Sequence, residues 1–244
     1  MRLAKYLAHA GIASRRQAEV LITQGRVRIN GCVVREAATK VDPQSDCIEF
    51  DGHSVVEEDP VYILLYKPAG FISTVYDPQG RSTVLELAAE VKERIYPVGR
   101  LDYDTEGILL LTNDGQFSNL IIHPRYKIDK KYQAWVTGFI KDDELRTLRE
   151  GVELEDGVTA PADVHVIERD DRTSMIEMTI HEGRKRQVKR MCAAVGHPVI
   201  SLKRTGVGLL TLEGLDKGQY RFLRQEEVEL LKAMAENESQ SPQV

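Results

Sequence analysis

The sequence has few cysteines, and none of them is placed to pair with another. Cys32, Cys47 and Cys192 are far apart, and no C-x-x-C motif occurs in the 244 residues. An odd and scattered set of cysteines is typical of reduced thiols in a cytosolic protein. The cysteines therefore predict a cytoplasmic location and argue against a structural zinc site.

Long apolar segments and cofactor fingerprints are also lacking. No apolar run approaches the roughly 20 residues that a membrane-spanning helix needs, and residues 1–17 are too polar for a secretory signal. The phosphate-binding pattern G-x-x-x-x-G-K-[ST] occurs nowhere in the chain. These absences predict a protein without a membrane partner and without a nucleotide cofactor.

The composition that remains is that of a globular protein. Apolar residues make up 42% and charged residues 29% of the chain. The length suits one sizeable domain with a small one, or a single larger domain.

The net charge of −5 conceals two basic segments. Residues 1–40 contain eight Lys and Arg against two Asp and Glu, and residues 181–206 contain seven against one. An acidic protein with concentrated basic segments is a better candidate for nucleic-acid binding than its overall charge suggests. On charge alone, ordinary solvated surfaces remain an open alternative.

The N-terminal segment has the signals of a small module of two helices and hairpins. Residues 3–10 fit a short amphipathic helix, and a second helix is predicted from Ser14, with Gln17 completing a capping box and Gly25 ending the helix. The pairs Asn30-Gly31 and Asp51-Gly52 separate short β-prone runs, which predicts hairpins. The acidic run before Pro60 marks a boundary, so this module with its linker is assigned residues 1–58.

A second domain is expected over residues 59–236, followed by a disordered polar tail at 237–244. Strand and helix signals alternate irregularly and no internal repeat occurs, which favours an α+β fold with a mixed, largely antiparallel sheet flanked by helices. The expected strands are 62–68, 107–113, 131–138, 162–169 and 174–180, and the expected helices are 82–94, 114–123, 142–151, 184–196 and 222–237.

The N-terminal module also has a pattern of basic residues. Two of them, Arg15 and Arg16, stand in the first turn of a predicted helix, where cations oppose the helix dipole, and a phosphate backbone would explain them. The run from LAKYLAHAG to RVRINGCVV closely resembles the S4 RNA-binding domain over residues 1 to about 48. The resemblance implies that the module grips structured RNA, with candidate contacts at Arg2, Lys5, Arg15, Arg16, Arg26 and Arg28.

The stretch GRLDYDTEGILLLTND, residues 99–114, contains three alternating acids. As a calcium-binding EF-hand loop it fails, because position 12 is Asn113 and positions 7 to 10 are the apolar residues 108–111. As a D-x-D phosphotransferase site it also fails, because Thr105 follows Asp102 by three positions and not four. A single nucleophile at Asp102, kept ionised by Arg100, and a purely structural turn both remain open on residue chemistry alone.

A second resemblance favours the nucleophile. The run YPVGRLDYDTEGILLLTNDG is similar to the signature of ribosomal-RNA pseudouridine synthases that carry an N-terminal S4 domain. Further resemblances follow in the family's order at LLYKPAGFIST (64–74), DKKYQAWVTG (129–138) and HEGRKRQVKRMCAAVGHPVISLKRTGVGLLTL (181–212). Together the two resemblances extend to about residue 230. Within the subfamily, the chain is most like the large-subunit synthase B group.

The resemblance implies the roles of individual residues. Asp102 would be the nucleophile, Lys189 its cationic partner, and Tyr132 the ring that stacks on the uracil and assists proton transfer. The substrate-binding residues would be Arg100, Arg186, Arg190 and Leu209, with Leu210 as the alternative to Leu209 beneath the base. Arg186, Lys189 and Arg190 have the spacing of one helix face. Asp104 and Glu106 would be scaffold.

The function expected is therefore the site-specific isomerisation of a flipped-out uridine to pseudouridine in ribosomal RNA, most simply that of the large subunit. An isomerisation needs no cofactor and no metal. The expected partner is ribosomal RNA or a precursor particle, and the protein is expected to be a monomer. The alternatives are a synthase acting on small-subunit ribosomal RNA or on transfer RNA, and a non-catalytic S4-domain assembly factor.

Overall fold

A computed structural model describes residues 1–240 of the chain, and these form two compact units. The first unit consists of residues 1–61 with two short segments, 91–95 and 113–115. The second unit contains the rest of the described chain. No helix within residues 1–240 is long and apolar enough to cross a membrane.

The first unit begins with two helices, as the sequence predicts. α1 spans Leu3–His9 and α2 spans Arg15–Thr23. The side chain of Ser14 accepts a hydrogen bond from the backbone N–H of Gln17 at 3.3 Å, which confirms Ser14 as the N-cap. The apolar faces of both helices are buried against one another and against the strands of this unit.

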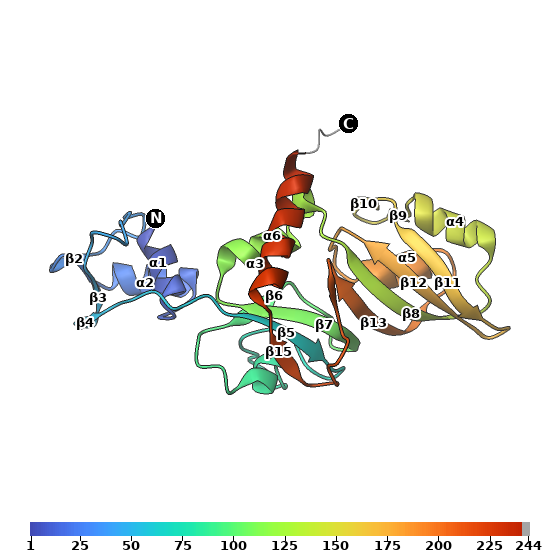
Figure 1. Cartoon of the computed structure of the whole chain (residues 1–244), viewed down its shortest axis with the longest axis horizontal. Helices are drawn as coiled ribbons and strands as arrows, with labels where there is room; N and C mark the ends of the chain where they lie inside the picture. The colour runs from blue at the N-terminus through green and yellow to red at the C-terminus, as the bar shows by residue number, and fades with distance from the viewer. Residues whose placement is uncertain (241–244) are drawn as a thin grey trace. The chain divides into compact units, whose positions relative to one another are not determined.

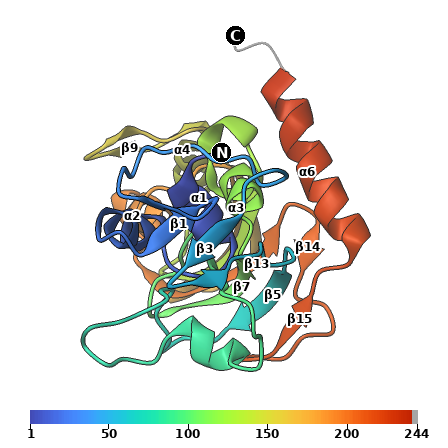
Figure 2. The same ribbon diagram turned by 90° about the vertical axis from the view of Figure 1, so that its left-hand side faces the viewer.

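Two hairpins complete the first unit (Figure 2). β1 (Val27–Ile29), β2 (Cys32–Val34), β3 (Ile48–Phe50) and β4 (His53–Ser54) form an antiparallel sheet in the order β2-β1-β3-β4. Both residues of each turn have positive φ, 51° and 79° at Asn30-Gly31 and 49° and 83° at Asp51-Gly52. This is the conformation that Asn-Gly and Asp-Gly favour in two-residue hairpins, so both predicted hairpins are confirmed.

The second unit contains a nine-stranded mixed sheet (Figure 1). The strand order is β11-β12-β8-β13-β7-β5-β15, with β14 paired to β13 and β6 paired to β7. Of the pairings in this sheet, β13 with β7 is parallel and the others are antiparallel, which confirms the expected sheet type. The strands are β5 Tyr62–Lys67, β6 Tyr96–Val98, β7 Thr105–Thr112, β8 Lys130–Thr137, β11 Asp163–Arg169, β12 Thr173–Ile180, β13 Val199–Val207, β14 Leu210–Thr211 and β15 Tyr220–Phe222. A separate hairpin consists of β9 (Glu153–Leu154) and β10 (Gly157–Val158).

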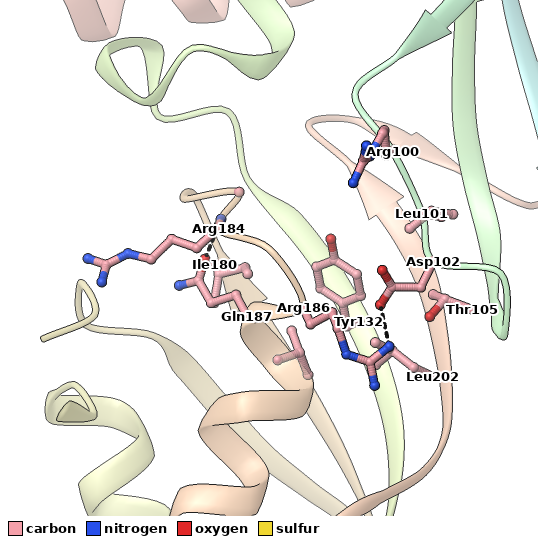
Figure 3. Close-up of a pocket in the computed structure, with 12 residues that line it drawn as sticks. Arg100, Leu101, Asp102, Thr105, Tyr132, Ile180, Arg184, Arg186, Gln187 and Leu202 are labelled. Atoms are coloured by element: carbon pink, nitrogen blue, oxygen red, sulfur yellow. Dashed lines mark hydrogen bonds and ion pairs between the residues drawn. The ribbon is translucent and has the colours of Figure 1, made fainter. Parts of the chain in front are cut away.

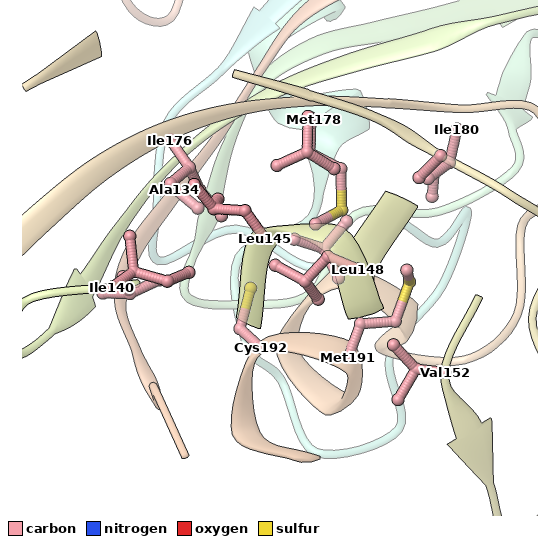
Figure 4. Packing of buried hydrophobic residues seen from close by; sticks show 14 of the residues in the cluster. Ala134, Ile140, Leu145, Leu148, Val152, Ile176, Met178, Ile180, Met191 and Cys192 are labelled. Carbon is pink, nitrogen blue, oxygen red and sulfur yellow. The ribbon is translucent and has the colours of Figure 1, made fainter. Parts of the chain in front are cut away.

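Helices flank this sheet and bury two apolar clusters. α4 (Asp142–Glu150) and α5 (Gln187–Ala194) pack on β8, β11 and β12, where Leu148, Met178 and Met191 are fully buried (Figure 4). α3 (Gly115–Ile122) and α6 (Gln225–Gln240) contribute to a second cluster with β5 and β7. Two 3₁₀ turns, η1 (Val84–Ala88) and η2 (Pro124–Tyr126), complete the elements.

The structure differs from the sequence expectations at several elements. The helix expected at 82–94 is only the turn η1, because Val84 and Ala88 are its buried side chains and no apolar stripe continues beyond them. α5 begins at Gln187 and not at Arg184, because Arg186 has a left-handed backbone with φ 52°. β13 was not expected, because Lys203, Arg204 and Gly206 interrupt its apolar pattern.

The C-terminal end of the chain differs in part from the expected tail. α6 continues to Gln240, so residues 237–240 are helical. The rest of the expected disordered tail, residues 241–244, lies outside the described residues.

The parallel contact of β7 with β13 leaves no room for a side chain at Gly107. Gly107 has φ 116°, and a Cβ atom there would lie 2.1 Å from the carbonyl oxygen of Arg204. We therefore expect Gly107→Ala to lower the free energy of unfolding by about 2–4 kcal/mol, through strain and separation of the strands.

Urea denaturation of the full chain measures this effect. Gly183→Ala is the matched control, because Gly183 does not have positive φ and has no atom within 4 Å of an added Cβ; its effect should be within about 0.5 kcal/mol. Equal stability of the two variants would contradict the close approach.

Candidate active site

One buried lysine supports the backbone on which Asp102 stands. The Nζ atom of Lys67, at the end of β5, donates hydrogen bonds to the carbonyl oxygens of Thr105 at 2.7 Å, Asp102 at 3.0 Å and Pro68 at 3.1 Å. Lys67 is fully buried, and an ammonium group has three donors, all of which are used here. Burial lowers the pKa of Lys67 to about 8.

The side chain of Ser73 forms two hydrogen bonds with the backbone of Leu101, the residue that precedes Asp102. The hydroxyl of Ser73 donates to the carbonyl oxygen of Leu101 at 2.9 Å and accepts from the N–H of Leu101 at 3.1 Å. A further turn forms where the N–H of Thr105 donates to the carbonyl oxygen of Asp102 at 3.1 Å. The backbone at Asp102 is therefore fixed from both sides, while its carboxylate stays 31% exposed.

Two cations from the start of α5 face the Asp102 carboxylate. Arg186 Nη1 lies 3.6 Å and Lys189 Nζ lies 3.5 Å from Asp102 Oδ2. Figure 3 shows the carboxylate turned toward the Arg186 guanidinium and beside the ring of Tyr132. The structure thus brings together the predicted nucleophile, its predicted cationic partner and the predicted tyrosine.

The backbone conformation that brings Arg186 to Asp102 was not predicted from the sequence. Arg186 is the N-cap of α5 and has φ 52°, which is uncommon for a residue other than glycine. Such backbone conformations concentrate at functional sites. The expectation that Arg186 lies on the same helix face as Lys189 and Arg190 is therefore corrected, because Arg186 precedes the helix.

Arg190 and its neighbour Arg184 are engaged elsewhere. Arg190 forms two hydrogen bonds with the Asp156 carboxylate, at 2.8 and 3.0 Å. Arg184 donates to the carbonyl oxygens of Gly157 and Val158 at 2.8 and 2.7 Å, and Figure 3 shows its guanidinium pointing away from Asp102. Both arginines hold the β9–β10 hairpin, so the structure does not place Arg190 with the other candidate substrate-binding residues.

A hollow of about 70 Å³ lies between Asp102 and Tyr132. Its apolar walls come from Ile180, Val188 and Leu202, and the exposed Arg100 stands at its edge. Tyr132 is half-buried on β8. The hollow therefore combines a carboxylate, a phenol and apolar surface, a composition suited to a flat heterocycle next to a sugar.

Neither leucine predicted beneath the base lines this hollow. Leu209 is 38% exposed between β13 and β14, and Leu210 is buried in the cluster with α6. Leu202 lines the hollow instead. The sequence pattern did not single it out, because β13 itself was not expected.

Sequence reasoning also gave no role to Arg204. It is buried on β13, where its Nε donates to the carbonyl oxygen of Ile108 at 2.8 Å and its Nη1 donates to the hydroxyl of Tyr132 at 3.4 Å. The sequence contained a signal for Lys67, which ends an apolar strand run, because a charge in such a place is rarely buried without a role. Arg204 gave no such signal, because it stands between Lys203 and Thr205.

The other two acids of the 99–114 stretch are each paired. Asp104 accepts a hydrogen bond from Lys189 at 2.5 Å, which lowers the pKa of the Asp104 carboxyl. Glu106 pairs with Lys217 at 2.7 Å. Within residues 1–240, no three side chains of His, Cys, Asp or Glu are grouped as metal ligands would be.

The basic residues of the first unit are mostly free for an external ligand. Arg2, Arg15, Arg16 and Arg28 are exposed and form no ion pair with the described residues, whereas Lys5 is half-buried. Arg26 differs, because it forms a two-bond ion pair with Asp51 at the second hairpin turn. Five of the six candidate RNA contacts are therefore not already neutralised by an acid.

Comparison with known proteins shows the family of the chain. Residues 61–194 match the RNA pseudouridylate synthase family, and residues 1–47 match the S4 domain. The chain is 52% identical over 238 residues to the ribosomal large subunit pseudouridine synthase B of Bacillus subtilis, with 97% of each chain covered. It is 39% identical to the ribosomal small subunit pseudouridine synthase A of Vibrio vulnificus over 94% of this chain and 98% of that protein.

A solved structure shares the fold over nearly the whole chain. A crystal structure of a pseudouridylate synthase superposes with a TM-score of 0.67 at 33% identity, covering 95% of this chain and 99% of the other. The chain belongs to the RNA pseudouridylate synthase family and carries an S4 domain at its N-terminal end. Both resemblances stated from the sequence are confirmed.

The burial of Lys67 predicts a stability difference that depends on pH. The pKa of Lys67 is about 8 in the folded chain and near 10.5 when unfolded. Between these values the unfolded chain binds the proton and the folded chain does not, so the contribution of Lys67 to stability rises with pH. The free energy of unfolding of the wild type minus that of Lys67→Met should rise by about 3 kcal/mol across this window.

Urea denaturation of both proteins at several pH values measures this difference. The subtraction removes the other groups that titrate in the same range. A difference that stays flat, or that falls as the pH rises, would contradict a buried ammonium at Lys67.

Proposed function

We propose that this protein converts a specific uridine to pseudouridine in ribosomal RNA, with Asp102 as the nucleophile. The observation that supports it most is the position of the Asp102 carboxylate. It lies at the edge of the hollow, opposite Tyr132 and within 3.6 Å of Arg186 and Lys189. The uridine leaves its helical stack to reach this hollow, as bases do in enzymes that act on a buried ring.

The reaction rearranges bonds within one nucleotide. The bond from N1 of uracil to C1′ of ribose breaks, a bond from C5 to C1′ forms, C5 loses a proton and N1 gains one. An ionised carboxylate attacks the ribose or assists the departure of the base, as carboxylates do in glycoside chemistry. Arg186 and Lys189 stabilise the negative charge of Asp102 before the reaction and of the leaving uracil during it.

Tyr132 acts on the base. Its ring provides a stacking surface for the uracil, and its hydroxyl is within reach to assist the proton transfer at C5. The hydrogen bond from Arg204 at 3.4 Å orients that hydroxyl. Arg100, exposed at the edge of the hollow, contacts the adjacent phosphate or fills the position that the flipped base leaves.

The substrate proposed is ribosomal RNA of the large subunit, free or in a precursor particle. The S4 module supplies exposed arginines for the phosphate backbone. The relative named for the large subunit is 52% identical and the one named for the small subunit is 39% identical, which favours the large subunit. The protein would act as a monomer in the cytoplasm.

A non-catalytic assembly factor is a weaker alternative. An RNA-binding protein has no need for a carboxylate placed between two cations beside a tyrosine. The observed grouping of Asp102, Lys189 and Tyr132 therefore favours an enzyme.

Mapping of pseudouridines in cellular RNA tests the function and its substrate. In a strain that lacks the gene for this chain, one or a few positions of large-subunit ribosomal RNA should lose pseudouridine. The wild-type gene should restore them. Asp102→Asn should not, because the amide has no negative charge with which to attack or stabilise.

Each other result has a defined meaning. Loss of pseudouridine only in small-subunit ribosomal RNA or in transfer RNA would show that this RNA is the substrate and that the large-subunit assignment is wrong. Full restoration by Asp102→Asn would show that the Asp102 carboxylate is not needed for the reaction. An unchanged map in the deletion strain would overturn the enzyme proposal.

If the S4 module binds the phosphate backbone, its arginines should contribute to the salt dependence of RNA affinity. Removing two phosphate contacts with Arg15→Gln and Arg16→Gln in the full chain should reduce the slope of log K against log salt by about 1.4 to 1.8. Arg26→Gln is the matched control and should change the slope less, because Asp51 already neutralises Arg26. Equal slopes for the wild type and the double variant would contradict the phosphate contacts.

A further inference from the structure

A second hollow, of about 130 Å³, also borders Tyr132 and is lined by two buried cations. Lys130 at the start of β8 and Arg204 on β13 line it, and each is only 7% exposed. Its apolar walls include Val98 and Val207. Charged side chains are almost never buried to this extent unless an opposite charge accompanies them.

Neither cation has an acid partner. Lys130 Nζ donates only to the carbonyl oxygen of His181, at 3.1 Å. Arg204 donates to the carbonyl oxygen of Ile108 and to the Tyr132 hydroxyl. In the described part of the chain, no carboxylate forms an ion pair with either side chain.

The nearby acids do not compensate for this charge. Glu182 also lines the hollow, but it accepts hydrogen bonds from Arg184 at 3.0 Å, from Gln187 at 2.8 Å and from the N–H of Ala160 at 3.2 Å. Asp129 is exposed and forms no ion pair with Lys130. Burial and the charge of Arg204 together lower the pKa of Lys130 to about 8.

The hollow is therefore positive, partly apolar and without an anion of its own. The apolar part of its walls lowers the local dielectric constant, which strengthens the attraction of a bound anion. The hollow shares Arg100, Tyr132 and Arg184 with the hollow that contains Asp102. An anion held there would lie next to a base positioned beside Asp102.

We propose that this hollow binds a phosphodiester group of the RNA backbone at or next to the target uridine, through Lys130 and Arg204. The inference rests on the proposed function, because it assumes RNA as the substrate. Phosphate oxygens accept strong hydrogen bonds from ammonium and guanidinium groups. The phosphate would complete the charge balance of the site.

The chain offers a matched pair of lysines for the test. Lys131 follows Lys130 on β8, but its side chain points to the other face of the strand, is exposed and pairs with Glu177 at 3.2 Å. Lys130→Met and Lys131→Met therefore remove the same charge from adjacent positions. Only the first removes it from the hollow.

The first measurement uses inorganic phosphate as the probe and needs no RNA. Phosphate should raise the melting temperature of the wild type and of Lys131→Met by a similar amount, and that of Lys130→Met by clearly less. The shift common to all three reports the general effect of phosphate on proteins. Without phosphate, Lys130→Met should melt no lower than the wild type, because a buried cation without an acid is unfavourable.

The second measurement is turnover of the ribosomal RNA fragment that carries the modified uridine. Lys130→Met should raise KM about tenfold or more and leave kcat nearly unchanged, as expected when uniform binding is lost. It should also reduce the salt slope of RNA binding by about 0.7 to 0.9. Lys131→Met should stay within about twofold of the wild type.

The outcomes separate the possible errors. If Lys130→Met matches Lys131→Met in both measurements, there is no anion site. If it differs with inorganic phosphate but not with RNA, the hollow binds free phosphate and the assignment to RNA is wrong. If the wild type makes no pseudouridine, the proposed function fails, and the phosphate measurement still decides whether the hollow binds an anion. Should Lys130→Met not fold, Lys130→Gln replaces it in every arm.

Discussion

The site depends on one buried ammonium group. Lys67 has three donors and meets three carbonyl oxygens, two of which belong to Asp102 and Thr105. Because β5 pairs with β7, with Lys67 opposite Gly107, this contact ties the turn to the centre of the sheet. The direction of the Asp102 side chain, and its distance from the cations of α5, follow from that attachment.

Charge is distributed around this turn in an unequal way. Asp104 and Glu106 each have a lysine partner at short distance, whereas Asp102 faces Arg186 and Lys189 at 3.5 to 3.6 Å. The Glu106–Lys217 pair stabilises the turn, and the Asp104–Lys189 pair connects the turn to α5. The carboxylate with the longer contacts is the one that remains accessible from the hollow.

The sequence was sufficient for features that depend on local patterns. The Ser14 cap, the Asn30-Gly31 hairpin and the strand that follows Asp102 are set by neighbouring residues, and they were predicted. The structure does not bring Arg190 or Leu209 to the hollow beside Asp102, because Arg190 pairs with Asp156 and Leu209 lies between β13 and β14. Sequence reasoning assigned no role to Lys67 or Arg204, because most of the groups that hold these two side chains are distant from them in the chain.

Resemblance supplied what local patterns left open. Residue chemistry alone did not separate a nucleophile from a structural turn at Asp102. The resemblance to the family signature favours the nucleophile, and the cations near Asp102 are consistent with that proposal. No pattern in the sequence indicated the left-handed backbone of Arg186.

The most direct test of the account compares the three acids of residues 99–114 in the purified full-length protein. Pseudouridine formation in the ribosomal RNA fragment is measured for Asp102→Asn, Asp104→Asn and Glu106→Gln. The account predicts no detectable product with Asp102→Asn, and activity within about tenfold of the wild type for the other two. Product formation by Asp102→Asn, or an equally complete loss with Glu106→Gln, would contradict the claim that Asp102 alone reacts.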